Sequence, residues 1–279
     1  MNLSLLQNFK ENNFFLDPFP HIIIENALPE ELYNKLSNTY PTNRFNNTNE
    51  NNNELVLYDE EIQKDNEISD LWKNFISFHK SKEFCHQIFD IFSKSIVTAY
   101  PNFFKNKEEL YNLKVALNES DDADIFLSSG IYCNTPVKKK SARVGIHADT
   151  PSKITSTLFY MKDKQDIAGG DLILHYWRVN LPIFLKKIIL AKRKNFLNNI
   201  IKKFQFLFIG NRKKLKYQSN VLIMYLDSID SLHSVTAREV TKNFRRFCFF
   251  RQKYKKRLYE SYSIIDRVLY FKNYKFFKF

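Results

Sequence analysis

Apolar side chains recur at helical spacing in the first hundred residues. Leu32 and Leu36 lie four positions apart and follow Pro29, a residue that suits the first turn of a helix because its missing N–H has no helical partner there. A second stretch, 71–100, carries aromatic and aliphatic residues at the same spacing. The pattern predicts a largely helical N-terminal layer over residues 1–110 that packs on the core of the protein.

From about residue 112 the pattern changes to short runs typical of β-strands. The runs cover residues 113–117, 125–133, 154–161, 171–178, 220–226 and 246–251, and a shorter apolar run occupies 22–24. Turn signals such as Gly169-Gly170 separate them. Many short strands without regular helices between them predict a sandwich or a barrel. We therefore expect a β core over 111–255 and a C-terminal extension over 256–279, within one structural unit.

One segment inside the β core breaks this pattern. Residues 181–216 contain eleven Lys and Arg, no Asp or Glu, and apolar residues at helical spacing. We predict a basic amphipathic helical insertion, with its apolar face on the core or on a membrane surface. Its Lys face would meet an anionic partner such as a substrate or a lipid head group. The alternative is a solvated, Lys-rich surface with no partner.

The net charge and the cysteine content indicate the charge of possible partners and the cellular compartment, but they do not identify a function. The formal net charge of +13 attracts phosphates, anionic lipids and acidic substrates alike. No helix-turn-helix, zinc-finger or RNA-stacking motif is present. Cys85, Cys133 and Cys248 form neither a disulfide framework nor a zinc site, which favours a reducing compartment. No apolar run approaches the roughly 20 residues that span a bilayer, and we expect a cytoplasmic protein.

The candidate chemistry begins with His147 and Asp149. On a strand, residues two positions apart point to the same face, so this imidazole and this carboxylate could bind one metal ion. His233 follows another apolar run much later in the chain and could supply a third ligand. Two histidines and one carboxylate leave open positions on Fe(II), which an oxygenase needs for its co-substrate and for O₂.

The order of these residues resembles the Fe(II)/2-oxoglutarate dioxygenase superfamily, in its prolyl-hydroxylase-like branch, over roughly residues 15–252. The flanking motifs that resemble this branch are Asn134-Thr135-Pro136, Leu158-Phe159-Tyr160, Gly169-Gly170-Asp171-Leu172 and His233-Ser234-Val235-Thr236. The opening Asp17-Pro18-Phe19-Pro20-His21 is similar to the lead-in of uncharacterised bacterial members. The resemblance implies an α+β fold with a double-stranded β-helix (jelly-roll) core. It also implies Fe(II) bound by His147, Asp149 and His233, with 2-oxoglutarate and O₂ as co-substrates.

The resemblance further implies an arginine, after the last histidine, that binds the far carboxylate of 2-oxoglutarate. An arginine can hold a carboxylate through two parallel hydrogen bonds. Arg246-Phe247-Cys248 resembles the family's arginine-aromatic-small pattern, in which the arginine faces inward, whereas Arg245 lies one residue closer to the usual spacing. We prefer Arg246 and keep Arg245 as the alternative. Tyr132 is a further candidate for a hydrogen bond to the co-substrate.

The function expected from these residues is hydroxylation of an unidentified substrate, anionic if the basic insertion contacts it, with release of succinate and CO₂. The alternative is a non-catalytic jelly-roll module that binds a glycan, a nucleic acid or a membrane surface. Fold and metal ligands of this kind occur in enzymes with very different substrates, so the substrate is not readable from the sequence.

Overall fold

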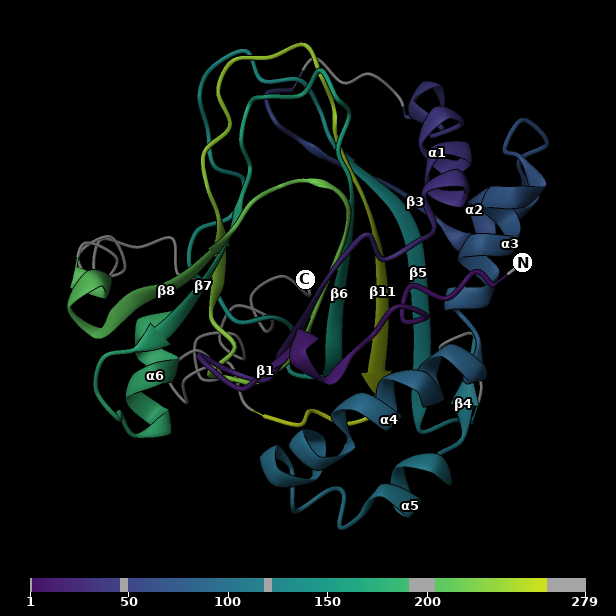
Figure 1. The fold of residues 1–279 in the computed structure, drawn as a ribbon. Coiled ribbons are helices and arrows are strands. Elements are labelled where there is room, and N and C mark those ends of the chain that lie inside the picture. Colours follow the sequence, from purple (N-terminus) through teal and green to yellow (C-terminus); the bar gives the residue numbers. More distant parts are fainter. Residues whose placement is uncertain (1, 46–49, 118–121, 191–203, 260–279) are drawn as a thin grey trace, which may run out of the picture.

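The computed structural model describes residues 2–45, 50–117, 122–190 and 204–259, and every structural statement below refers to these ranges. Helices and strands both contribute to the fold (Figure 1). The helices are α1 (Glu30–Asn38), α2 (Asp59–Lys64), α3 (Asp70–His79), α4 (Lys82–Ala99), α5 (Lys107–Tyr111) and α6 (Ile183–Leu190), with 3-10 turns η1 (Glu11–Asn13) and η2 (Thr42–Arg44). No helix in these ranges combines the length and the apolar character needed to cross a bilayer.

The largest element is an eight-stranded sheet. Its main path runs β1 (Phe14–Phe15), β2 (His21–Glu25), β9 (Ser219–Leu226), β6 (Lys153–Met161), β11 (Arg245–Tyr254), β5 (Ile125–Asn134) and β3 (Glu54–Tyr58), and β4 (Val115–Ala116) pairs with β5. Neighbours on the main path are antiparallel. The long strand β11 lies between β5 and β6, so its side chains reach the middle of both faces of the sheet.

A smaller sheet has the order β10 (His233–Val235), β7 (Leu172–Trp177) and β8 (Ile209–Leu215). An apolar cluster joins the two sheets, with Leu172 and Leu174 from β7 against Ile223 from β9 and Phe247 from β11. In Figure 1 helices α1 to α5 gather to the right of the large sheet and below it, while β7, β8 and α6 project to the left.

The helical layer covers the other face of the large sheet. Ser69 and Ser81 begin α3 and α4 as N-caps, because each side chain accepts a hydrogen bond from a backbone N–H of the first turn. Both helices bury aromatic residues against β11, and Phe75, Phe84 and Phe250 are fully buried. This packing forms the main hydrophobic core and leaves the opposite face of the sheet free to line a pocket.

The sequence located most of these elements and misjudged two regions. The stretch 71–100 forms α3 and α4, and each of the six β-type runs overlaps a strand. The run 22–24 forms β2 as expected, but the sequence did not predict β3, which pairs with β5 within the large sheet. The helical expectation for 181–216 holds for α6 but is wrong for β8, which pairs with β7. Residues 191–203 and most of the expected C-terminal extension lie outside the described ranges.

Candidate metal and co-substrate site

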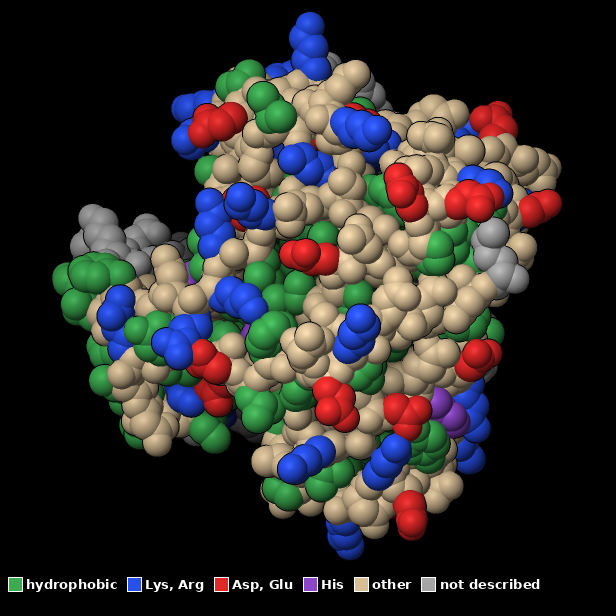
Figure 2. Space-filling model, viewed as in Figure 1, with side chains coloured by type: hydrophobic (Ala, Val, Ile, Leu, Met, Phe, Trp, Pro, Cys, Tyr) green, Lys and Arg blue, Asp and Glu red, His purple; other side chains and the backbone are tan. Residues whose placement is uncertain are grey.

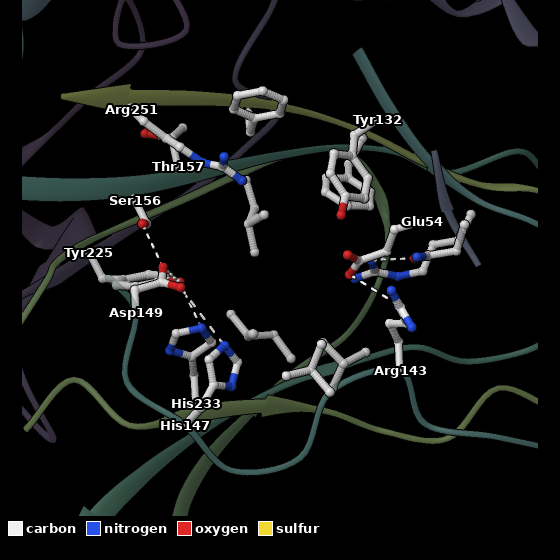
Figure 3. A pocket seen from close by; sticks show the side chains of 18 of the residues that line it. Glu54, Tyr132, Arg143, His147, Asp149, Ser156, Thr157, Tyr225, His233 and Arg251 are labelled. Carbon is white, nitrogen blue, oxygen red and sulfur yellow. Dashed lines mark hydrogen bonds and ion pairs between the residues drawn. The ribbon is translucent and has the colours of Figure 1, made fainter. Parts of the chain in front are cut away.

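The three predicted metal ligands meet at one end of a pocket between the two sheets (Figure 3). His233 is the first residue of β10, and His147 lies beside it in an isolated bridge with two backbone hydrogen bonds of 3.1 and 3.0 Å. The expectation that His147 and Asp149 lie on a regular strand is wrong, since this segment is extended but outside the named strands. The two backbone hydrogen bonds to β10 hold the segment around His147 in place, as strand pairing would.

The geometry of the three side chains suits one metal ion. One ligand atom from each of His147, Asp149 and His233 lies within 4.8 Å of the other two. The Nδ1 atom of His147 lies 2.9 Å from the Gly145 carbonyl, and that of His233 lies 3.1 Å from the Ser231 carbonyl. A carbonyl only accepts, so Nδ1 carries the proton and Nε2 keeps a lone pair for a metal. Burial, followed by the neighbouring His147, lowers the pKa of His233 to about 3, which keeps this imidazole neutral.

One oxygen of Asp149 is already occupied by protein donors. Its Oδ2 atom lies 2.7 Å from the Ser156 hydroxyl and 2.9 Å from the Lys153 ammonium. The Tyr225 hydroxyl lies 3.4 Å from this oxygen but closer, at 3.0 Å, to His233 Nε2, to which it donates its one hydrogen. Its Oδ1 atom faces His147 Nε2 at 3.8 Å. Burial would raise the pKa of Asp149, but the charge of Lys153, followed by the neighbouring imidazoles and the Ser156 hydrogen bond, outweighs burial and holds that pKa well below its usual range. The carboxylate is therefore ionised and offers Oδ1 to a metal.

A second buried carboxyl, Asp227, lies behind Asp149. Its Oδ2 atom is 2.7 Å from the same Ser156 hydroxyl. Burial and the charge of Asp149 raise the pKa of Asp227 well above its usual range, so this group is protonated. A hydroxyl has one hydrogen, and protonated Asp227 can donate to Ser156 while Ser156 donates to Asp149. Sequence reasoning missed this support, although Lys153 and Ser156 follow Asp149 at four and seven positions.

Arg245 lies in the wall of the same pocket and is 3% exposed. Its guanidinium donates to Gly170 O at 3.1 Å, Asn134 Oδ1 at 3.3 Å and Tyr160 OH at 3.1 Å. These partners are neutral, and within the described ranges no acidic oxygen lies within 4.0 Å of it. A buried charge without a counter-ion is costly. The pocket is thus prepared for an anionic group at Arg245.

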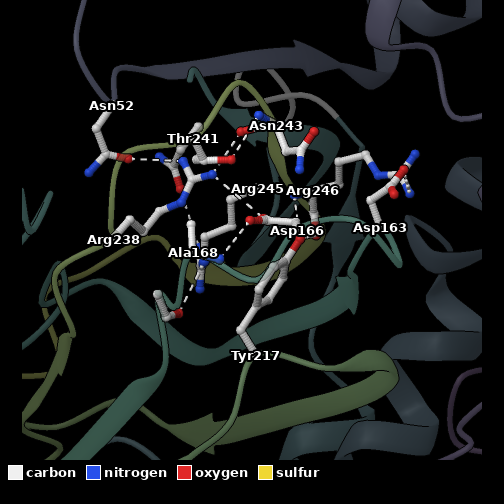
Figure 4. Close-up of polar contacts among 12 residues, drawn as sticks. Asn52, Asp163, Asp166, Ala168, Tyr217, Arg238, Thr241, Asn243, Arg245 and Arg246 are labelled. Atoms are coloured by element: carbon white, nitrogen blue, oxygen red, sulfur yellow. Dashed lines mark hydrogen bonds and ion pairs between the residues drawn. The ribbon is translucent and has the colours of Figure 1, made fainter. Parts of the chain in front are cut away.

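The Gly169-Gly170 turn leaves space for the Arg245 side chain. Both glycines have positive φ, +86° and +93°, which favours glycine because it has no Cβ. A Cβ on Gly170 would stand 2.8 Å from Nε of Arg245. Close to this turn, buried Arg238 lies 3.5 Å from buried Asp166 and donates to the backbone carbonyls of Thr135 and Asn243 (Figure 4). The tight turn thus has a packing role beside the pocket.

The expected inward orientation of Arg246 is wrong. Its guanidinium pairs with Asp163 at 3.0 Å, donates to Met161 O at 3.2 Å and lies over the Tyr40 ring, outside the pocket (Figure 4). Side chains alternate along a strand, and Arg245 rather than Arg246 shares the pocket face of β11 with Phe247. The arginine-aromatic-small resemblance therefore places the inward residue one position too late.

The remaining polar residues of the pocket lie at two places. Tyr132, the other predicted co-substrate residue, lines the pocket on β5 across from the metal ligands, beside Glu54 and Arg143 (Figure 3). Burial and then Glu54 raise the pKa of Tyr132. Arg251 lines the pocket near the metal ligands, with its guanidinium carbon 4.0 Å from the centre of the Phe249 ring. Sequence reasoning did not single out Glu54 or Arg251.

Comparisons with known proteins find similar shapes and no similar sequence. No protein-family model and no curated protein sequence matches the chain. Similar solved structures include a Pseudomonas putida prolyl-4-hydroxylase, with 10% identity and a TM-score of 0.41 over 85% of this chain and 93% of that one. The carbocyclase SnoK from nogalamycin biosynthesis has 11% identity and a TM-score of 0.47, over 97% and 93% of the two chains.

A third similar structure is HygX from Streptomyces hygroscopicus, which was solved with nickel and 2-oxoglutarate bound. It has 10% identity and a TM-score of 0.42, over 84% of this chain and 83% of that one. Because the identities are this low and the TM-scores stay below 0.5, the function proposed below rests on the side chains of this chain.

Proposed function

We propose that this protein is an Fe(II)- and 2-oxoglutarate-dependent oxygenase that hydroxylates its substrate. The proposal rests on one observation, which is that a single pocket contains both a candidate metal site and a buried arginine that could bind a carboxylate. At one end two imidazole Nε2 atoms and a carboxylate oxygen converge. In its wall lies a buried guanidinium that has only neutral partners. A dicarboxylate with one end on a metal and the other on an arginine satisfies both parts.

The strand arrangement supports a double-stranded β-helix for this fold. The central strands β9, β6, β11 and β5 form one side, and β8, β7 and β10 form the other. The segment that carries His147 extends the smaller sheet through its bridge to β10. Both metal-binding parts of the chain would then belong to one sheet, while the co-substrate arginine belongs to the other. The presence of all three ligand side chains in one pocket also favours an enzyme over the non-catalytic binding module.

The residues of this chain would divide the work as follows. His147 and His233 bind Fe(II) through Nε2, and Asp149 binds it through Oδ1. Bound Fe(II) supplies the redox chemistry, in which 2-oxoglutarate, O₂ and a substrate C–H bond give succinate, CO₂ and the hydroxylated product. Arg245 pairs with the far carboxylate of 2-oxoglutarate, replacing Arg246 in the role expected from the sequence.

Neighbouring residues would orient these groups and keep water out. Lys153 and Ser156 hold Asp149 Oδ2, which fixes the carboxylate for binding through its other oxygen. Tyr160 accepts a hydrogen bond of 3.1 Å from the Arg245 guanidinium and so helps to orient it. Phe247 and Phe249 line the wall between the arginine and the metal ligands with apolar surface, which strengthens the electrostatic interactions inside the pocket.

The proposal is tested by 2-oxoglutarate turnover. Purified protein with Fe(II), ascorbate and 2-oxoglutarate should release succinate, first without a substrate and then with metabolite, peptide and glycan pools. A pool that contains the substrate should raise the rate. Asp149→Ala should abolish succinate release, whereas Arg246→Gln, which lies outside the pocket, should retain it. Absence of succinate under all of these conditions, from protein that binds Fe(II), would contradict the proposed reaction.

A further inference from the structure

Helix α6 lies on the projecting side of the molecule, and one of its lysines departs from the sequence expectation. The basic insertion was expected to place its apolar face on the core or on a membrane surface, with its lysines toward an anionic partner. Instead Lys186 is buried, with Nζ 2.6 Å from Asp230 Oδ1 and above the Trp177 ring. Ile183 and Phe184 point outward, with 59% and 61% of their surface exposed. The helix therefore buries one lysine and packs Ile189 inward, while Ile183 and Phe184 face solvent.

A second apolar segment lies beside this helix. Residues 204–208 are attached to α6 through Gln205, which donates to Ile189 O at 2.9 Å. Phe204, Phe206 and Leu207 are 49%, 62% and 52% exposed. Figure 2 shows hydrophobic side chains gathered on the projection at the left, where Figure 1 places α6. We name Ile183, Phe184, Phe204, Phe206 and Leu207 the outer apolar surface. Several large exposed apolar side chains on one projection of a folded chain indicate an interaction site.

The charge around this surface selects the kind of partner. The sequence from 172 to 226, which contains β7, α6 and β8, has no Asp or Glu. Exposed cations in its described part include Arg178, Lys214 and Lys216. Some cations pair with acids from outside the segment, as Lys186 does with Asp230 and Lys214 with Asp171. Exposed apolar side chains on a segment whose own charged residues are all cations match the boundary of an anionic bilayer, where the apolar groups enter the acyl region and the cations meet phosphates.

We propose that the outer apolar surface docks the protein on a membrane that contains anionic lipids. Helix α6, which carries part of this surface, packs against the segment that carries the metal ligand His147. Ile189 of α6, together with Ile209 and Leu232, packs against Ile146 and Ala148, the two neighbours of His147. Docking would hold the segment that carries His147 next to the bilayer. The proposal is independent of the oxygenase reaction, since it rests on exposed side chains outside the pocket.

Vesicle flotation with the full chain tests the docking. The protein should float with vesicles of phosphatidylcholine and phosphatidylglycerol in a 7:3 ratio, and much less with phosphatidylcholine alone. Phe184→Asp combined with Phe206→Asp should lower the fraction bound at least about tenfold. Ile167→Asp is the matched control, because Ile167 is 88% exposed and lies outside the projection. This control should bind like the wild type.

Salt and cation variants separate the electrostatic part from the apolar part. Lys216→Gln should weaken binding to the anionic vesicles by about fivefold at low salt, and the loss should shrink as salt rises. Equal binding of the Phe184→Asp, Phe206→Asp variant and the wild type would overturn the proposal. So would no wild-type binding at low salt, or a wild-type dimer that the same variant converts to a monomer. Because vesicle binding is measured without 2-oxoglutarate, it can fail or succeed separately from turnover.

Discussion

The two faces of strand β11 show how one element serves the fold on one side and the site on the other. Cys248 and Phe250 point into the helical layer, where both are fully buried among apolar and aromatic side chains. Arg245 and Arg251, with odd numbers, line the pocket instead. The helix-covered face provides the hydrophobic burial that stabilises the sheet. That stability lets the opposite face keep a buried arginine, two imidazoles and two carboxyl groups, each of which is costly to bury.

The comparison predicts that substitutions on the helix-covered face act on stability. Phe250 is fully buried and packs on His79, Phe75 and Phe84. Phe250→Ala should lower the free energy of unfolding by about 3–5 kcal/mol, measured by urea denaturation. The folded fraction should still bind Fe(II). If the free energy of unfolding fell by less than about 1 kcal/mol, or if the folded variant no longer bound Fe(II), the two faces of β11 would not have separate roles in stability and in the site.

Substitutions on the pocket face should act on ligands. Arg245→Gln should weaken 2-oxoglutarate binding to the metal-loaded protein by about 2–5 kcal/mol, because it leaves the co-substrate carboxylate without its charged partner. Arg246→Gln is the matched control, one residue away on the opposite face, and should change binding little. Calorimetric titration measures both. The reverse pattern would restore the assignment that the sequence favoured and would contradict the pocket assignment.

The donors behind Asp149 should have a smaller effect, on metal affinity. Ser156→Ala and Lys153→Met each remove one donor from Asp149 Oδ2. Each should weaken Fe(II) binding by about 10–100-fold, as is usual for groups that orient a metal ligand. Anaerobic competition with a chromophoric chelator measures the affinity. Unchanged affinity in both variants would show that Asp149 needs no support for its orientation.

The helix-covered face also makes a pH prediction. His79 donates from Nδ1 to Phe75 O and accepts the Leu5 N–H at Nε2, and burial lowers its pKa to about 3. The unfolded chain takes up a proton near pH 6.5 while the folded chain does not, so stability is lost as pH falls from about 6.5 toward 3. Between pH 7 and pH 5 the loss from this group is up to about 2 kcal/mol. His79→Gln should remove that part, and an unchanged pH dependence in this variant would contradict the assignment.

The same two faces explain what could be read from the sequence. His147, Asp149 and His233 were predictable, because their residue types and order follow from the needs of a metal. The strands were predictable from runs such as 125–133 and 220–226, which form β5 and β9. Choosing between Arg245 and Arg246 required the register of β11 against β5 and β6, and a shift of one residue exchanges the faces.

Other features depended on contacts between distant segments. The apolar run Leu55-Val56-Leu57 was not singled out as a strand, and it forms β3 through pairing with β5. Asp227 becomes a support of the site only because β9 ends beside β6, where Ser156 joins it to Asp149. The burial of Lys186 depends on its pair with Asp230, 44 positions away. Helical spacing alone did not predict it, since that pattern treats every lysine as a solvent-facing residue.

The most direct test of the central claim is sequential calorimetric titration under anaerobic conditions, first with Fe(II) and then with 2-oxoglutarate. The wild type should bind about one Fe(II) per chain, and 2-oxoglutarate should bind only after the metal. Asp149→Ala should lose the metal step, and Arg245→Gln should keep the metal step and lose most of the 2-oxoglutarate step. Fe(II) binding that is equal in wild type and Asp149→Ala, or 2-oxoglutarate binding that is independent of metal, would contradict the proposed site.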